Sequence, residues 1–152
     1  MTALAALAIS ACGEKDESGF VHPPVDGSNP HAAIGVIDDW SGRLSEGDTK
    51  GAASLFAIPS LAVNGDLPLR LTSREETLAF NRSLPCGAKL VKARPAGDLI
   101  AATFRLTDRP GDACGNGVGQ LARTAFQIED GHITQWRRLP DPEALRPQGE
   151  IA

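Results

Sequence analysis

The chain has 152 residues, a net charge of −4 and three cysteines, and it contains no tyrosine. This length accommodates one domain of ordinary size, and no second domain is expected in it. The basic residues are dispersed along an acidic sequence, so we expect no nucleic-acid partner. No apolar run approaches the roughly 20 residues that a membrane-crossing helix needs.

The N-terminus has the pattern of a bacterial lipoprotein export signal. An apolar run from Ala3 to Ala8 leads into Ile9-Ser10-Ala11-Cys12, in which small residues precede a thiol that can receive a diacylglyceryl group. We therefore predict a signal peptide at residues 1–11 and a mature chain that begins at lipidated Cys12. This chain would be anchored in the lipid bilayer on the extracytoplasmic face of the cell membrane. Only Met1-Thr2 precede the apolar run, whereas export signals usually carry Lys or Arg there, so we expect the true start to lie upstream.

Residues 12–29 are predicted to form the lipidated cysteine and a flexible tether. They are rich in polar residues, Gly and Pro, and they have neither helical nor strand periodicity. As a flexible chain, this segment would hold the domain about 20 to 25 Å from the lipid surface. Residues 142–152, at the other end of the chain, are expected to form a C-terminal tail.

The domain is predicted to begin with two helices. Asn29 is a favourable N-cap, and Pro30 suits the first helical position because its missing N–H donor costs nothing there. Apolar residues recur at spacings of three and four along one stripe of this helix: Ala33, Ile37, Trp40 and Leu44. Asp48 can cap a second, short helix that continues through Phe56 and stops at Pro59.

The rest of the domain has the pattern of strands and one further helix. Two short strands are expected near residues 61–64 and 69–72. Ser73 and Glu76 form a capping box, which predicts a third helix that Pro85 ends. Beyond it the hydrophobic period changes to two, and four strands are predicted, at residues 88–94, 99–106, 118–128 and 133–139. This order predicts an α+β domain over residues 30–141, with its helices on one face of a curved sheet.

The three cysteines divide into one for the lipid and two for a disulfide. With Cys12 lipidated, Cys86 and Cys114 remain as a pair in a compartment that permits oxidation. We predict that they form a disulfide worth roughly 3 to 4 kcal/mol in the chain-entropy model, with two buried free thiols as the alternative. Three oxygen-bearing residues recur every fourth position as calcium ligands can, but without the EF-hand pattern: Asp108, Asp112 and Asn116. We expect neither a metal nor a cofactor.

Two stretches resemble the nuclear transport factor 2-like, or SnoaL-like, superfamily. Ser45-Glu-Gly-Asp48 followed by Leu55-Phe56-Ala57 is similar to the junction of its first two helices. Residues 128–137, Ile-Glu-Asp-Gly-His-Ile-Thr-Gln-Trp-Arg, are similar to its last hairpin. The resemblance implies a cystatin-like cone, in which a curved mixed or antiparallel sheet with three helices packed on one side surrounds a cavity. Members use that cavity for catalysis, for ligand binding or for no known purpose, so the fold alone names no function.

Residues that the superfamily's enzymes use are missing from this chain. Isomerases of the ketosteroid type and scytalone dehydratase-like members rely on tyrosines, and this chain has none. Limonene epoxide hydrolase-like members carry an aspartate directly after the Ile-Thr-x-Trp-Arg segment. That position is Arg138 here, and an arginine does not act as a base at neutral pH.

The polar groups that remain for a cavity lie mainly on the last two strands. If Arg123, Gln127 and Arg137 converge there, their donors would suit a carboxylate or another oxygen-rich ligand. The alternative is that these arginines coat the outside of the sheet and pair with acidic residues there. Trp40 is expected in the core or the cavity wall, where it would contact a ligand. Asp39 is the better candidate for a buried acid on the first helix.

Three functions therefore stay open, and we favour the first. It is a lipid-anchored, non-catalytic domain whose cavity binds a small apolar ligand or a partner protein. The second is a SnoaL-like isomerase, cyclase or hydrolase for a small hydrophobic substrate, with Asp39 as the acid–base residue and Arg123 or Arg137 stabilising negative charge. The third uses the sheet face as the interface of a homodimer or of a complex with another protein.

Overall fold

The computed structural model describes residues 29–141, which form three α-helices and six strands. The predicted signal peptide, the lipidated Cys12, the tether up to residue 28 and the C-terminal tail lie outside the described residues. The helices are α1 (Pro30–Ser45), α2 (Thr49–Ser54) and α3 (Arg74–Ser83). The strands are β1 (Phe56–Asn64), β2 (Leu67–Leu71), β3 (Gly87–Ala96), β4 (Leu99–Thr107), β5 (Leu121–Glu129) and β6 (His132–Leu139), and a 3₁₀ turn, η1, covers Gly115–Gly117.

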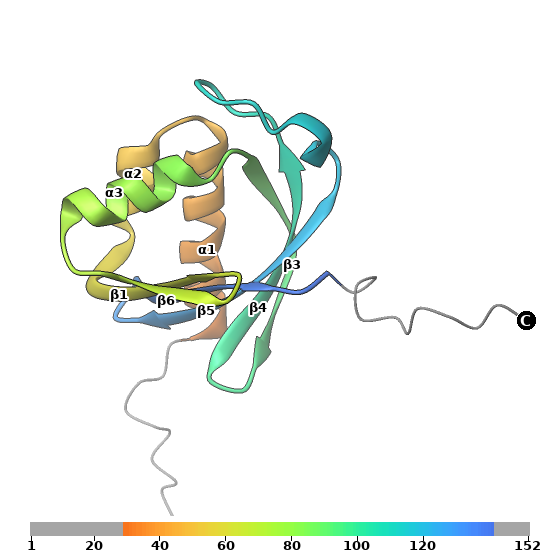
Figure 1. The fold of residues 1–152 in the computed structure, drawn as a ribbon. Coiled ribbons are helices and arrows are strands. Elements are labelled where there is room, and N and C mark those ends of the chain that lie inside the picture. The colour runs from red at the N-terminus through yellow and green to blue at the C-terminus, as the bar shows by residue number, and fades with distance from the viewer. Residues whose placement is uncertain (1–28, 142–152) are drawn as a thin grey trace, which may run out of the picture.

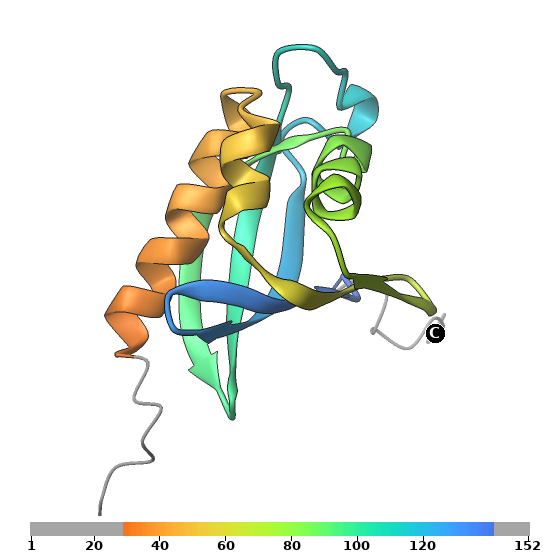
Figure 2. The ribbon, with the colours of Figure 1, turned by 90° about the vertical axis from the view of Figure 1, so that its left-hand side faces the viewer.

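The six strands form one sheet in the order β2-β1-β6-β5-β4-β3. Neighbouring strands are antiparallel except β1 and β6, which run parallel. The sheet curves around the three helices, which lie on its concave side (Figures 1 and 2). The predicted fold class, an α+β domain with a curved mixed sheet and three helices on one side, is confirmed.

The sequence signals for α1 are confirmed. The side chain of Asn29 accepts a hydrogen bond from the backbone N–H of His31, and Pro30 opens the helix. The four residues of the apolar stripe are all buried: Ala33, Ile37, Trp40 and Leu44. Because the stripe faces the sheet, it fixes how α1 lies on β3 and β4.

The predicted extent of the second helix is wrong. Asp48 caps α2 as expected, since its side chain accepts from the backbone N–H of Gly51. The helix nevertheless ends at Ser54, and Phe56 begins β1. Phe56 is fully buried and pairs with Ile133 of β6. The periodicity of such a short apolar run fits a helix or a strand, and burial in the sheet makes it a strand here.

The capping box of α3 forms with one difference from the prediction. The Ser73 hydroxyl accepts from the backbone N–H of Glu76, at 3.2 Å. The Glu76 carboxylate reaches back to Thr72, accepting from its backbone N–H at 2.6 Å and from its hydroxyl at 2.8 Å. These hydrogen bonds, that from the Thr72 backbone first, lower the pKa of Glu76 below its ordinary value.

Two groups of aromatic rings form the centre of the core. Trp40 contacts Phe104 and Phe126 edge to face, with ring centroids 5.9 and 5.4 Å apart. Phe80 contacts Phe56 and Trp136 in the same manner, at 5.9 and 5.2 Å. Each edge-to-face pair adds roughly 0.5 to 1.5 kcal/mol beyond the burial of its area. The rings come from α1, α3 and four strands, so they join the helices to the sheet.

Candidate ligand cavity

The register of β5 and β6 decides which side chains face the helices. Partners across an antiparallel pair share a face, and successive residues alternate between faces. Phe126 pairs with the buried Trp136, and Thr124 pairs with Arg138, so these four side chains lie on the concave face. Arg138 therefore points towards the helices.

The three predicted binding residues of the last strands lie on the other face. Arg137 is opposite Ala125, Arg123 is opposite Leu139, and Gln127 is opposite Gln135. The prediction that they converge in the cavity is therefore wrong. They lie on the outer face of the sheet, as in the alternative, but neither arginine forms the ion pair with an acidic residue that the alternative included, among the residues that the structure describes. Gln127 borders a separate open groove, near the start of α1.

The prediction that Asp39 is a buried acid is also wrong. Its carboxylate is exposed and accepts a hydrogen bond from Arg43 Nε at 2.9 Å, one helical turn further along α1. Arg43 also pairs with Asp48, and these two carboxylates, Asp39 first, raise its pKa. Trp40, the neighbour of Asp39, lines the cavity as expected.

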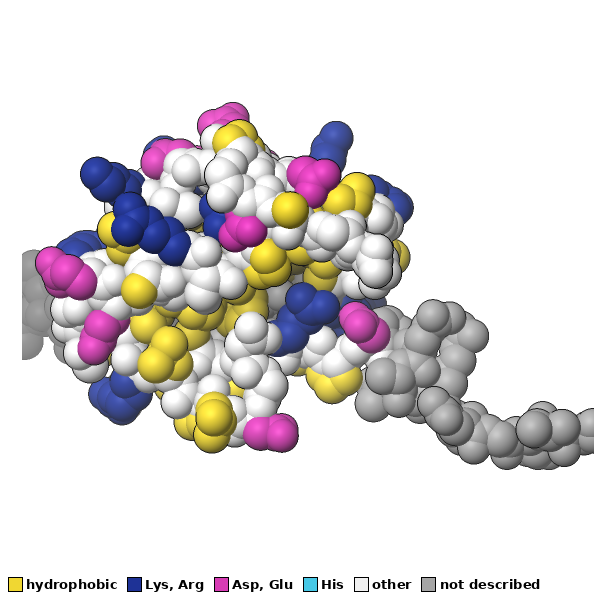
Figure 3. Space-filling model, turned by 45° about the horizontal axis from the view of Figure 1, so that its top comes forward, with side chains coloured by type: hydrophobic (Ala, Val, Ile, Leu, Met, Phe, Trp, Pro, Cys, Tyr) yellow, Lys and Arg dark blue, Asp and Glu magenta, His cyan; other side chains and the backbone are white. Residues whose placement is uncertain are grey.

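A cavity of about 140 Å³ opens between α1, the segment after α3 and the concave face of the sheet. Figure 3 shows hydrophobic side chains gathered in a hollow on this side of the molecule, with basic side chains at its edge. Most of the lining is apolar: Trp40, Leu44, Leu84, Pro85, Ala88, Phe104, Leu106 and Ala122. The disulfide-bonded Cys86 and four residues with polar groups complete it: Asn64, Thr124, Trp136 and Arg138.

The indole N–H of Trp136 has no hydrogen-bond partner among residues 29–141, although its side chain is only 3% exposed. Ser60 carries the other unpartnered buried side-chain atom of this part of the chain, away from the cavity lining. The second tryptophan differs, since Trp40 Nε1 donates to Asn81 Oδ1 at 2.9 Å. Trp136 is a residue of the cavity wall, and its buried N–H is a donor that nothing in the described domain uses.

Among the described residues of the lining, Arg138 alone is charged. Its side chain is 35% exposed, and its guanidinium lies 3.9 Å from the Asp141 carboxylate, too far for a hydrogen bond. The lining contains no Asp, Glu or His, so none of the described residues around the cavity offers the usual proton acceptor of a general base. The lining is therefore suited to bind an apolar molecule and to donate hydrogen bonds to it, with Arg138 as the charged donor.

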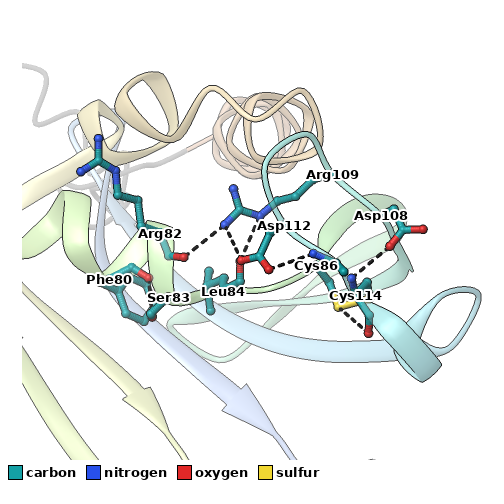
Figure 4. Close-up of polar contacts among 10 residues, drawn as sticks. Phe80, Arg82, Ser83, Leu84, Cys86, Asp108, Arg109, Asp112 and Cys114 are labelled. Carbon is teal, nitrogen blue, oxygen red and sulfur yellow. Dashed lines mark hydrogen bonds and ion pairs between the residues drawn. A yellow bond between two sulfur atoms is a disulfide. The ribbon is translucent and has the colours of Figure 1, made fainter.

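Residues 84–86 form one wall of the cavity, and contacts with the loop that contains η1 hold this wall in place. The predicted disulfide is present between Cys86 and Cys114, whose Cα atoms are 4.5 Å apart. Arg109, only 8% exposed, donates from Nε to the Leu84 carbonyl at 3.0 Å and from a terminal nitrogen to the Arg82 carbonyl at 3.1 Å (Figure 4). A cation here satisfies carbonyls that the end of α3 leaves free.

The acidic residues of the η1 loop are used within the loop. Asp108 accepts from the Cys114 backbone N–H, and Asp112 accepts from the Ala113 backbone N–H and pairs with Arg109 at 3.5 Å. No group of three or more His, Cys, Asp or Glu within residues 29–141 is arranged to hold a metal ion. None of the helices in the same residues combines the length and the hydropathy needed to cross a bilayer.

Comparisons with known proteins identify the fold. No family model matches the chain, and no curated protein matches its sequence. Among solved structures, a proposed polyketide cyclase from Xanthomonas campestris pv. campestris is 19% identical, with a TM-score of 0.53 over 77% of this chain and 96% of that one. A protein from Catenulispora acidiphila with a ketosteroid isomerase-like fold, solved with trimethylamine, is 15% identical, with a TM-score of 0.54 over 70% and 85%.

A third solved structure, an NTF2-like protein of unknown function from Cytophaga hutchinsonii, is 14% identical, with a TM-score of 0.54 over 72% of this chain and 90% of that one. At these identities the likeness shows the fold alone. The nuclear transport factor 2-like resemblance of the domain is therefore confirmed at the level of fold, and the function has to be argued from the cavity.

Proposed function

We propose that the cavity binds a small, mostly apolar molecule that carries one hydrogen-bond acceptor, such as a carboxylate or a ketone. The observation that carries this proposal is the unpartnered, buried N–H of Trp136, a residue of the wall of an apolar cavity. Buried donors in native proteins nearly always have a partner, and an orphan costs about 1 to 3 kcal/mol. An acceptor on a ligand would remove that cost.

The volume limits the size of the ligand. Drug-sized pockets have volumes of roughly 300 to 1,000 Å³, whereas an engineered apolar cavity of about 150 Å³ in another protein binds benzene. A cavity of about 140 Å³ therefore suits a single aromatic ring or a short aliphatic chain. Arg138, partly exposed, would attract the acceptor end of an anionic ligand and give the site a preference for a carboxylate.

The alternative is a SnoaL-like enzyme, a class to which the proposed cyclase among the structural neighbours points. Such an enzyme needs an acid–base residue beside its substrate, and the cavity lining contains no carboxylate or imidazole. Asp39, the candidate from the sequence, is on the outside of α1. Binding without catalysis is the function that this lining supports better.

Two adjacent arginines provide a matched test of the cavity. We expect Arg138→Gln to weaken the binding of benzoate by about tenfold, because it removes the only cation of the lining. Arg137→Gln makes the same change of charge one residue away on the outer face, so we expect its affinity to stay within about twofold of the unmodified protein. Tryptophan fluorescence during a benzoate titration measures both, and equal losses in the two variants would contradict a site inside the cone.

We also propose that Cys12 is lipidated and anchors the protein at the extracytoplasmic face of the membrane. The support is the sequence Ile9-Ser10-Ala11-Cys12 after an apolar run. In cells that express the natural gene with its upstream region, a labelled fatty acid should be incorporated into the protein, and Cys12→Ser should abolish the label. Cys86→Ser changes a different cysteine, one that the disulfide uses, and should retain the label. Incorporation that survives Cys12→Ser would refute the anchor.

A further inference from the structure

The strands carry a pronounced excess of positive charge on one face. The only acidic residue in the six strands is Glu129, at the end of β5. Of the strand residues with positive side chains, Arg138 faces the cavity, and the others lie on the outer face: Arg70, Lys89, Lys92, Arg94, Arg105, Arg123 and Arg137. The basic residues that are dispersed along the sequence are thus gathered in space, and we call this set the basic outer face.

Strand register places these residues in rows across the sheet. Lys92 pairs with Thr103, which pairs with Arg123. In the next row, Arg94 pairs with Ala101, Ala101 with Ala125, and Ala125 with Arg137. Small side chains therefore occupy the middle of the face and long cationic ones surround it. Six of the seven basic side chains are exposed and Arg123 is half-buried.

The charge of this face is not neutralised within the described domain. The ion pairs among residues 29–141 join Arg43 to Asp39 and Asp48, Arg109 to Asp112, and Arg138 to Asp141, and none involves the basic outer face. Six acidic residues lie on the helices or beside them: Asp38, Asp39, Glu46, Asp48, Glu75 and Glu76. Others occupy the turns at the ends of the strands: Asp66, Asp98 and Asp130. The excess of positive charge is therefore confined to the sheet, because the three helices carry as many acidic as basic residues.

We propose that the basic outer face docks the domain onto an anionic lipid surface. The choice of a membrane as the partner rests on the anchoring at Cys12 proposed above. A tether of residues 12–29 would hold the domain about 20 to 25 Å from the headgroups. Electrostatic attraction acts over a Debye length of about 8 Å, so the face would be attracted whenever the flexible tether lets the domain approach the lipid surface. Exposed Lys and Arg are attracted to the phosphate groups of anionic lipids.

The same charge argues against a second copy of the chain as the occupant. A two-fold dimer places identical surfaces against each other, and here it would bring the basic outer faces of both copies together. Small residues at the centre of the face, Ala101 and Ala125, suit a shallow contact with many headgroups more than a pocket for one. The cavity lies on the opposite face of the sheet, so docking leaves it uncovered.

Vesicle sedimentation tests the docking without reference to lipidation. The full chain carrying Cys12→Ser is mixed with phosphatidylcholine vesicles that do or do not contain phosphatidylglycerol. We expect binding to the anionic vesicles only, and we expect it to weaken as salt is raised. Adding Arg94→Gln and Arg137→Gln should reduce this binding by about tenfold. The matched control, Lys50→Gln with Arg82→Gln, makes the same change of charge on exposed residues of α2 and α3 and should leave it unchanged.

Three results would overturn the proposal. Equal losses in the two double variants would show that net charge alone matters. Equal binding to vesicles without phosphatidylglycerol would assign the interaction to the apolar run at residues 3–8. Displacement from the anionic vesicles by a DNA oligonucleotide at matched charge would assign the face to a different polyanion. The Cys12→Ser protein carries no lipid, and the assay uses no cavity ligand. The result of this assay is therefore independent of the tests of lipidation and of ligand binding.

Discussion

Replacing Cys86 and Cys114 together by alanine is expected to lower the free energy of unfolding by about 3.5 kcal/mol. The disulfide joins residues 28 positions apart, and the chain-entropy model relates the stabilisation to the loop that it closes in the unfolded chain. Urea denaturation of the oxidised protein, the reduced protein and the double variant measures the effect. The reduced protein and the variant should unfold at the same urea concentration, well below the oxidised protein.

The same substitution is expected to weaken the binding of benzoate. Cys86 and Leu84 belong to the cavity wall, and Arg109 and the disulfide tie this wall to the loop after β4. Without the disulfide, the segment keeps its hydrogen bonds to Arg109 but loses its covalent link, so the cavity is less well ordered before the ligand arrives. A full loss of stability with unchanged affinity would show that the wall does not depend on the disulfide.

The elements that were predictable from the sequence depend on short-range signals. The start of α1 follows from Asn29 and Pro30, and the start of α3 follows from Ser73 and Glu76, because each cap forms within one helical turn. The disulfide followed from the number of cysteines. These signals need no knowledge of what the element packs against.

The side of the sheet on which each residue lies was not predictable in the same way. Alternation divides β5 and β6 into two sets of residues, but it does not say which set the helices cover. Trp136 did offer a signal, since a buried tryptophan and Arg138, two residues later, share a face. Arg138 stands where the hydrolases carry an aspartate, and it is the arginine that reaches the cavity.

Two further features required the three-dimensional structure. Arg109 lies in a loop of Gly, Asp and Pro, and nothing around it in the sequence indicates that it binds the carbonyls at the end of α3. The basic outer face is assembled from β2, β3, β4, β5 and β6, so its density of charge depends on strand order and register. A count of charges along the chain averages this face with the acidic residues of the helix caps, turns and loops.

The two tryptophans are expected to respond in opposite ways to the same substitution. We expect Trp40→Phe to lower the free energy of unfolding by about 2 kcal/mol more than Trp136→Phe does. Both changes replace a buried indole by a smaller ring that keeps its edge-to-face partners. Only Trp40→Phe leaves a buried acceptor, Asn81 Oδ1, without its donor, whereas Trp136→Phe removes a donor that has no partner.

Urea denaturation of both variants measures the difference in stability, and benzoate titration gives the reverse order for binding. Trp136→Phe should weaken the complex by about fivefold or more, because the lost N–H is the donor for the ligand's acceptor. Trp40→Phe also changes the apolar wall, and we expect a smaller loss of affinity from it. Equal costs in stability would mean that Trp136 Nε1 is satisfied in solution and would remove the main support for the site.

A donor left unpaired in the core reduces the stability of the unliganded domain. Phenylalanine at position 136 would avoid this cost, and the edge-to-face contact with Phe80 does not require the N–H. Buried polar groups without a partner are expected at functional sites, and a ligand that supplies the missing partner is one explanation for them. If Trp136→Phe stabilises the unliganded protein while it weakens the complex, the indole N–H is present for the ligand and not for the fold.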